Sequence, residues 1–177
     1  MLRVRVVKAA RATLTPAFLR EVLTRAAEEP ALGRRLGEGG RELTVRVTGD
    51  RELRRLNQAF LGLDEPTDVL SFPSGDSDGY LGDLALSWPA VVRQAAAFGH
   101  PVAVEAALLT VHGLLHLLGW DHADPSQARE MDRLTQACLV RAGLPPVAER
   151  LDAVAAEIPE RVDRVPETDL RGRLSPS

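Results

Sequence analysis

Three of the four histidines in this chain lie within one short stretch, HGLLHLLGWDH, at positions 112, 116 and 122. Residues four apart on a helix point the same way, with Cβ atoms about 5–6 Å apart. His112 and His116 would therefore present two ring nitrogens to one point in space. That separation suits two ligands of one tetrahedral zinc ion.

Gly119 follows His116 by three positions, where a helix carrying both histidines would end. Glycine adopts the left-handed conformation that ends a helix and reverses the chain. The reversal would bring His122 back towards the helix as a third ligand. Three protein ligands with an open fourth position are typical of a catalytic zinc site rather than a closed structural one. We predict one zinc ion per chain, held by His112, His116 and His122, although nickel, cobalt or copper would suit the same donors.

The alternative explanation of these histidines is that they only fill the core. A single histidine on an apolar helix is usually a core residue whose hydrogen bonds are satisfied. Three unpaired imidazoles in a leucine-rich segment would instead cost a few kcal/mol of polar desolvation. A shared metal ion removes that cost, so the grouping favours metal binding.

Gly113 separates this pattern from a known class of proteases. The spacing His-x-x-x-His-x-x-Gly-x-x-His is that of the metzincins, in which a glutamate after the first histidine is the general base. Glycine cannot accept a proton, so a protease is not our first prediction. Zinc lowers the pKa of its water from about 15.7 to about 7. The predicted catalytic group is therefore a zinc-bound water held by the three histidines.

Three other residues are candidates for a part in this chemistry. Asp121 precedes His122 and would either hydrogen-bond a ligand histidine or cap the local turn. Asp83, within LGDL, is a candidate acid, base or structural group near the site. Trp120 would either stack on a base or act as a packing wedge between the ligand-bearing segments.

The periodicity of the chain predicts both strands and helices. Alternating polar and apolar residues predict strands at 3–7 and 42–49, and residues 67–88 have the features of a hairpin. Residues 33–41, GRRLGEGGR, are predicted to form a loop. Helical spacing and capping signals predict helices over 15–29, 89–98, 102–118 and 124–143. A further helix of about ten residues is predicted to begin after Asp50, which would cap it. The helix over 102–118 is apolar on nearly all sides, so we expect it to be buried all round.

The composition of the whole chain sets limits on its class. A length of 177 residues suits one domain, and the single cysteine, Cys138, excludes an intramolecular disulfide and a multi-cysteine zinc site. No segment approaches roughly 18 uncharged apolar residues, and the N-terminus has no uninterrupted apolar run, so we predict neither a membrane span nor a signal peptide. We therefore expect a cytoplasmic protein, which the single cysteine also fits.

Charge is distributed unevenly along the chain. Residues 1–60 carry 13 Lys or Arg against 7 Asp or Glu, whereas residues 61–177 carry 9 against 18. Such asymmetry indicates either a basic face for a polyanion or two sets of elements that are solvated by different charges.

The histidine stretch resembles the signature H-G-x-L-H-L-x-G-[YW]-D-H of the YbeY family of bacterial rRNA-maturation endoribonucleases. Three further segments resemble other blocks of that family, namely LNQAFLGLDEPTDVLSFP at 56–73, LGDLALS at 81–87 and EMDRLTQACLVRAGL at 130–144. The resemblance covers residues 40–144 well and residues 1–39 in outline.

The resemblance implies a zincin-like α+β fold, a mixed sheet of about four strands packed against several helices, in a single domain over residues 1–144. Residues 145–177 lie outside it, and their composition predicts a C-terminal extension that is partly helical and then loosely ordered. The implied activity is that of a single-strand-specific, zinc-dependent endoribonuclease in 16S rRNA 3′-end maturation and ribosome quality control. The implied partners are single-stranded or ribosomal RNA and the small ribosomal subunit, and the oligomeric state is left open.

One departure from the family pattern concerns RNA binding. Many members carry an arginine where this chain has Leu61, and leucine cannot contact a phosphate. Arg54 is a candidate substitute, and with Arg51 and Arg55 it forms the predicted RNA-binding group. The alternative, which the residue type alone favours, is that Arg54 is a solvated helix arginine.

Two other functions stay open at this point. One is a metal-dependent hydrolase of another substrate such as a peptide, against which Gly113 speaks. The other is a ribosome-associated accessory protein with a structural zinc ion and weak nuclease activity. The open fourth position speaks against a structural metal, whereas Leu61 in place of arginine speaks mildly for weaker RNA chemistry.

Overall fold

The computed structural model of the chain describes residues 1–75 and 78–147. Residues 76–77 and 148–177 are not described. The predicted C-terminal extension, residues 145–177, therefore lies outside the described residues from position 148 onward, and the predicted domain boundary after residue 144 stays a prediction.

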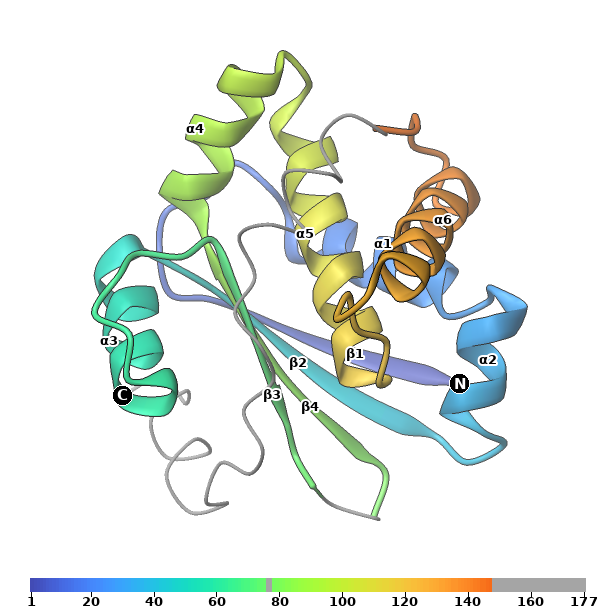
Figure 1. The fold of residues 1–177 in the computed structure, drawn as a ribbon. Coiled ribbons are helices and arrows are strands. Elements are labelled where there is room, and N and C mark those ends of the chain that lie inside the picture. The colour runs from blue at the N-terminus through green and yellow to red at the C-terminus, as the bar shows by residue number, and fades with distance from the viewer. Residues whose placement is uncertain (76–77, 148–177) are drawn as a thin grey trace.

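Four strands form one mixed sheet in the order β1-β2-β4-β3 (Figure 1). β1 pairs with β2, and β2 with β4, in parallel, whereas β3 and β4 form the predicted antiparallel hairpin. The strands are β1 (Leu2–Lys8), β2 (Arg41–Thr48), β3 (Val69–Pro73) and β4 (Tyr80–Ser87). The predicted mixed four-stranded sheet is confirmed.

Six helices among the described residues complete an α+β fold. They are α1 (Pro16–Ala26), α2 (Pro30–Leu36), α3 (Asp50–Leu61), α4 (Trp88–Phe98), α5 (Val102–Leu117) and α6 (Pro125–Arg141). Two of them begin at a predicted cap: Thr15 accepts a hydrogen bond from the Phe18 backbone N–H before α1, and Asp124 caps α6.

Among the described residues, no one helix combines the length and apolar character needed to cross a membrane. By length and composition alone, α4 and α5 taken together would meet such a test, but the chain bends by 115° between them.

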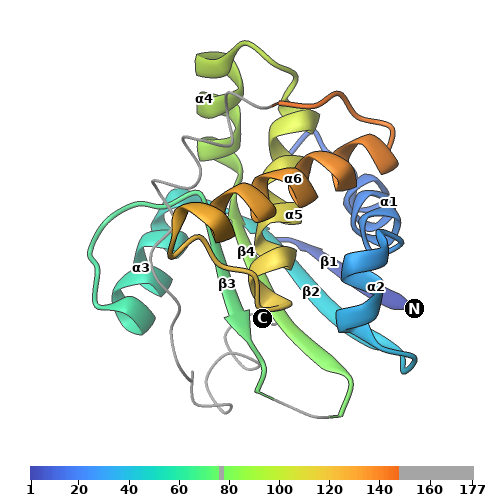
Figure 2. The same ribbon diagram turned by 45° about the vertical axis from the view of Figure 1, so that its right-hand side comes forward.

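The alternation of side chains along each strand divides the core in two. Leu84 and Leu86 on β4 belong to the larger cluster, which contains residues of α1, α5 and α6. Ala85, between them, points to the other face and packs with Phe72 against α3. Helices α1, α5 and α6 therefore cover one face of the sheet and α3 covers part of the other, as Figure 2 shows.

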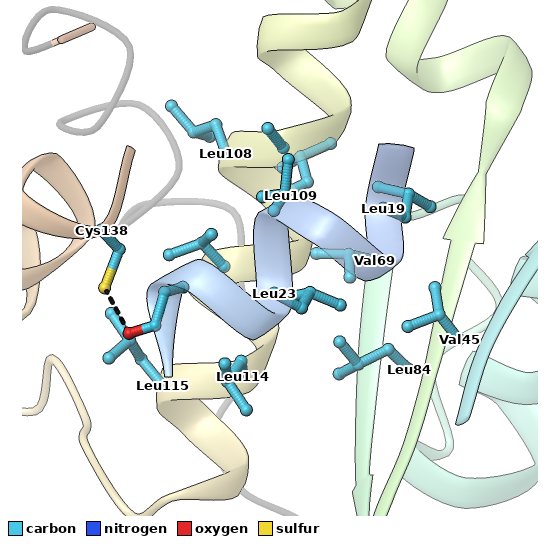
Figure 3. Close-up of a cluster of buried hydrophobic side chains, with 14 of the residues drawn as sticks. Leu19, Leu23, Val45, Val69, Leu84, Leu108, Leu109, Leu114, Leu115 and Cys138 are labelled. Atoms are coloured by element: carbon cyan, nitrogen blue, oxygen red, sulfur yellow. Dashed lines mark hydrogen bonds between the residues drawn. The ribbon is translucent and has the colours of Figure 1, made fainter. Parts of the chain in front are cut away.

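α5 is the central helix of the larger layer. Thirteen of its sixteen residues are buried, so the predicted all-round burial is confirmed. It packs against α1, α4 and α6 as well as β3 and β4. Figure 3 shows Leu108, Leu109 and Leu114 from α5 in the same buried cluster as Leu19 and Leu23 from α1.

Two local predictions are wrong. Residues 33–36 belong to α2 rather than to a loop, because Leu32 and Leu36, four apart, both reach the main core. Asp50 does not cap α3: it is the first helical residue, and Gly49 holds the cap position. The Asp50 carboxylate instead accepts hydrogen bonds from the Ser87 hydroxyl and the Arg93 guanidinium.

Candidate metal centre

The structure brings the three histidines of the 112–122 stretch together. The ring centroids of His112 and His116, one turn apart on α5, are separated by 5.0 Å. His122, from the following turn, lies 6.4 Å from His112 and 5.3 Å from His116 between centroids. One nitrogen of each ring lies within 4.8 Å of the others, close enough for one ion to reach all three after small side-chain rotations.

The turn that returns His122 to α5 is a Schellman motif. Gly119 has a φ of 94°, a conformation that L side chains rarely adopt. Its N–H donates to the His116 carbonyl, and the Trp120 N–H donates to the Leu115 carbonyl, each at 3.0 Å. The reversal at Gly119 is therefore as the sequence predicts, and it satisfies two carbonyls that α5 would otherwise leave unpaired.

The donor set suits a borderline metal ion. Neutral imidazoles are good ligands for zinc and its neighbours among the transition metals. Within the described part of the chain, no hydrogen bond satisfies the buried Nδ1 of His122, and the Asp121 Oδ1 oxygen is 3.9 Å away. His112 is fully buried, whereas His116 and His122 are partly exposed, so the group opens to solvent on one side.

Gly113 has a packing role that the sequence alone does not reveal. A Cβ atom at this position would lie 2.8 Å from Cδ2 of Leu84 and 3.2 Å from the Ser71 hydroxyl. The Ser71 hydroxyl in turn donates to the Gly113 carbonyl at 3.3 Å. Glycine therefore allows α5 to approach the β3–β4 hairpin closely, and the same contact leaves no room for a glutamate side chain.

Asp121 performs one of the two roles considered for it. Its carboxylate accepts a hydrogen bond of 2.7 Å from the backbone N–H of His122, which caps the local turn. The same oxygen is 3.9 Å from Nδ1 of the His122 ring, beyond hydrogen-bond distance. In this structure Asp121 shapes the backbone that carries His122 rather than bonding to its ring.

Asp83 is not brought to the histidines. It pairs across the sheet with Phe72, which packs against α3, whereas its neighbour Leu84 faces α5. The Asp83 carboxylate accepts a hydrogen bond of 2.8 Å from the Tyr80 hydroxyl on that far face. Strand alternation thus separates Asp83 from the candidate site, and a part in its chemistry is not supported by this geometry.

The predicted RNA-binding arginines, Arg51, Arg54 and Arg55, are likewise not brought together with the histidines. All three lie on α3, which packs on the sheet face opposite α5. Arg54 forms a two-bond ion pair with Asp64, at 2.7 and 3.1 Å. Leu61, at the end of the same helix, packs against the smaller core cluster.

Trp120 is a packing residue rather than a free stacking surface. It is only 6% exposed, and the guanidinium carbon of Arg35 lies 3.5 Å from its ring centroid. Its indole N–H donates to Glu130 on α6 at 3.4 Å. The contact with Arg35 has no local signal in the sequence, because the two residues are distant along the chain and the packing of α2 brings them together.

The fold and the histidine group define a class: a single-domain α+β protein that holds a potential three-histidine metal site at the end of a buried helix. The sequence profile of the family described as Endoribonuclease YbeY matches residues 7–143. The chain therefore belongs to the YbeY family, and the resemblance predicted from its signature is confirmed.

Individual relatives agree with this assignment. An Endoribonuclease YbeY from Gloeobacter violaceus is 53% identical over 102 residues, covering 52% of this chain and 53% of the relative. Another, from Chloroflexus aurantiacus, is 43% identical over 136 residues, covering 71% of this chain and 88% of the relative. The chain thus spans about half the length of the first relative and most of the second.

Among solved structures, the fold resembles the solution structure of TM1509 from Thermotoga maritima. The TM-score is 0.57 at 24% identity, and the match covers 88% of this chain and 97% of that one. This likeness supports the fold alone.

Proposed function

We propose that this protein is a zinc-dependent endoribonuclease that cleaves single-stranded RNA. Membership of a family described as endoribonucleases supports the class of reaction. The observation that carries the proposal is the gathering of His112, His116 and His122 around one point at the C-terminal end of α5. Zinc is the metal that we assign, because three neutral imidazoles are typical ligands of catalytic zinc.

Zinc, when bound, would supply Lewis-acid polarisation of a phosphate and a nucleophile at neutral pH. The chain's own residues supply the geometry. His112 and His116 are fixed by a buried helix, and the Schellman turn fixes the backbone before His122. Such preorganised donors lose little entropy when they bind an ion or a substrate.

The access side of the site suits a polymer substrate. His116 and His122 are partly exposed, and they stand at the C-terminal end of α5, where the chain turns at the surface. Gly113 places no acidic side chain beside the histidines, so a phosphate would meet no like charge at that position. The absence of a carboxylate at position 113 therefore suits an anionic substrate such as RNA.

We further propose a role in 16S rRNA 3′-end maturation and ribosome quality control, with the small ribosomal subunit as partner and the cytoplasm as location. Family membership supports the first part of this proposal, because the family resemblance implies that pathway. The basic character of residues 1–60 is consistent with contact to RNA phosphates.

The test compares wild type with His116→Ala, purified identically, on rRNA fragments and on casein, with and without a chelator. We expect only the wild type without chelator to cleave RNA, and neither protein to cleave casein. RNA cleavage that survives both the substitution and the chelator would contradict the proposal, and the identically purified variant reveals a contaminating nuclease.

The same experiment decides between the two other functions. Cleavage of casein would indicate a hydrolase of peptides. A protein that binds one metal ion per chain but cleaves neither substrate would indicate an accessory protein with a structural ion.

A further inference from the structure

Arg35, near the end of α2, contacts the turn that carries His122 in two ways. Its Nη1 atom donates a hydrogen bond of 3.0 Å to the Leu118 carbonyl. Its guanidinium carbon lies 3.5 Å from the centroid of the Trp120 ring, a close cation–π contact. Both partners fall between His116 and His122 in the sequence.

The two groups that Arg35 contacts are structural points of that turn. Leu118 is the C-cap of α5, and its carbonyl is one of the four that a helix end leaves without an intrahelical partner. Trp120 anchors the returning chain in the main core, and its indole N–H donates to Glu130 on α6. The turn is therefore held from one side by α2 and from the other by α6.

The three histidines depend on this turn unequally. His112 and His116 are fixed by α5, which is buried along most of its length. His122 lies outside any helix, two residues beyond Trp120, and its placement follows from the turn. Contacts that hold the turn therefore act on one ligand of the three.

We propose that Arg35 is a positioning residue of the metal centre, which holds the 118–120 turn so that His122 can share an ion with His112 and His116. The inference rests on the proposed metal site but not on the reaction it performs. Arg35 suits this role better than lysine, because a planar guanidinium stacks on an aromatic face while it donates hydrogen bonds from its edge.

The expected effect is a loss of metal affinity with little loss of fold. Residues that hydrogen-bond to a metal ligand typically change metal affinity by about 10- to 100-fold. Arg35 contacts the turn that precedes His122 rather than His122 itself. We therefore expect Arg35→Ala to weaken metal binding by about 10-fold. The unfolding temperature of the metal-free protein should change little, because Arg35 is exposed and Trp120 stays buried in the core.

The experiment titrates Zn²⁺ into metal-free full-length protein in competition with a chromophoric chelator. The variants are Arg35→Ala, Arg35→Lys and Arg34→Ala. Arg34 is the exposed neighbour on α2 and matches the loss of one charge. We expect Arg34→Ala to bind as wild type does, and Arg35→Lys to fall between wild type and Arg35→Ala.

A second readout needs no metal. The chain has two tryptophans, so a nitrogen–proton correlation spectrum shows two indole signals, from Trp88 and Trp120. In metal-free Arg35→Ala the Trp120 signal should move and the Trp88 signal should stay. A structural effect spread through the whole protein would move both.

Equal affinity, within twofold, of Arg35→Ala and Arg34→Ala would overturn the inference. Should Arg35→Ala fail to fold, the comparison of Arg35→Lys with Arg34→Ala decides in the same way. Wild type that binds no zinc would instead contradict the proposed metal site itself, so the two failures are distinguishable.

Discussion

The three histidines lie in different environments, and their substitutions should differ accordingly. We expect alanine at position 112, 116 or 122 to abolish tight zinc binding, because two imidazoles remain in each case. His112 is fully buried, so His112→Ala should also leave a cavity and lower the free energy of unfolding of the metal-free protein by about 1–3 kcal/mol.

His116→Ala and His122→Ala, at partly exposed positions, should leave metal-free stability nearly unchanged. Calorimetric zinc titration and urea unfolding of each metal-free variant measure the two effects separately. Tight binding retained by any of the three variants would contradict the assignment of that histidine as a ligand.

Asp50 gives a prediction about pH. Hydrogen bonds from Arg93 hold the pKa of its carboxyl below the ordinary 3.8; burial opposes this effect and the Ser87 hydroxyl adds to it. A carboxyl whose pKa is lowered by folding contributes stability that is complete above 3.8 and is lost as pH falls through the folded value. We expect Asp50→Asn to lower the free energy of unfolding at pH 7 by about 1 kcal/mol, since the site is partly exposed.

The gap between wild type and Asp50→Asn should narrow as the pH falls below about 4 and close at lower pH. Asp64→Asn is the matched control, because the Asp64–Arg54 pair has similar geometry but its carboxylate is more exposed than that of Asp50. Urea unfolding between pH 2 and pH 7 measures both variants. A gap that stays constant over this range would contradict the assigned role of the Asp50 carboxylate.

Individual residues of the site could be predicted to different degrees. The grouping of His112, His116 and His122 was predictable, because helical periodicity fixes the first two and Gly119 fixes the turn to the third. The position of Asp83 was not, since it depends on which face of β4 receives α5. The contact between Arg35 and Trp120 joins distant segments and has no local signal.

At the scale of elements, the close approach of α5 to the β3–β4 hairpin predicts that alanine has opposite effects on stability at two helical glycines. A Cβ at Gly113 would lie 2.8 Å from fully buried Leu84, whereas a Cβ at Gly33 on α2 would meet nothing nearer than 3.8 Å. Alanine favours a helix over glycine by about 1 kcal/mol. Gly33→Ala should therefore stabilise the protein by up to about 1 kcal/mol.

Gly113→Ala should instead destabilise the protein by about 1 kcal/mol, because overpacking of about 1–3 kcal/mol exceeds the gain in helix propensity. Chemical denaturation of both metal-free variants provides the measurement. Equal stabilisation by the two substitutions would show that α5 does not approach the hairpin as described.

The ends of helices were predictable where a capping residue next to the helix marks them. The starts of α1 and α6 and the end of α4 at Gly99 were predictable, because capping residues there act locally. α2 was not predicted, because its glycine and two arginines resemble a loop composition. The helix is stabilised by its two leucines, which pack into the core. Asp50 was misassigned as a cap because its partner, Arg93, comes from another helix.

At the scale of the whole molecule, Cys138 can report how metal binding stabilises the fold. The thiol is fully buried against the Ala26 carbonyl, as Figure 3 shows. Burial, assisted by the charge of Glu29, raises its pKa to about 12, so the thiol is unreactive until the protein opens. Iodoacetamide should therefore label Cys138 only in molecules that have opened or unfolded.

Zinc that binds only the folded state adds about 2.7 kcal/mol of stability at 100 times its dissociation constant. We expect zinc at that concentration to slow the labelling of Cys138 by about 100-fold when opening is rapid compared with labelling. The His116→Ala variant should show no such protection. Labelling that is equally fast with and without zinc in the wild type would contradict coupling between the site and the core that surrounds α5.

The central claim is that one metal ion on His112, His116 and His122 is required for RNA cleavage. The most direct measurement strips the metal, adds Zn²⁺ stepwise and follows cleavage of a single-stranded RNA that carries the 16S rRNA 3′-end sequence. We expect no cleavage before zinc is added, a rise that saturates at one equivalent per chain, and no rise with His122→Ala. Full cleavage by the metal-free protein, or restoration of His122→Ala by zinc at wild-type affinity, would contradict the claim.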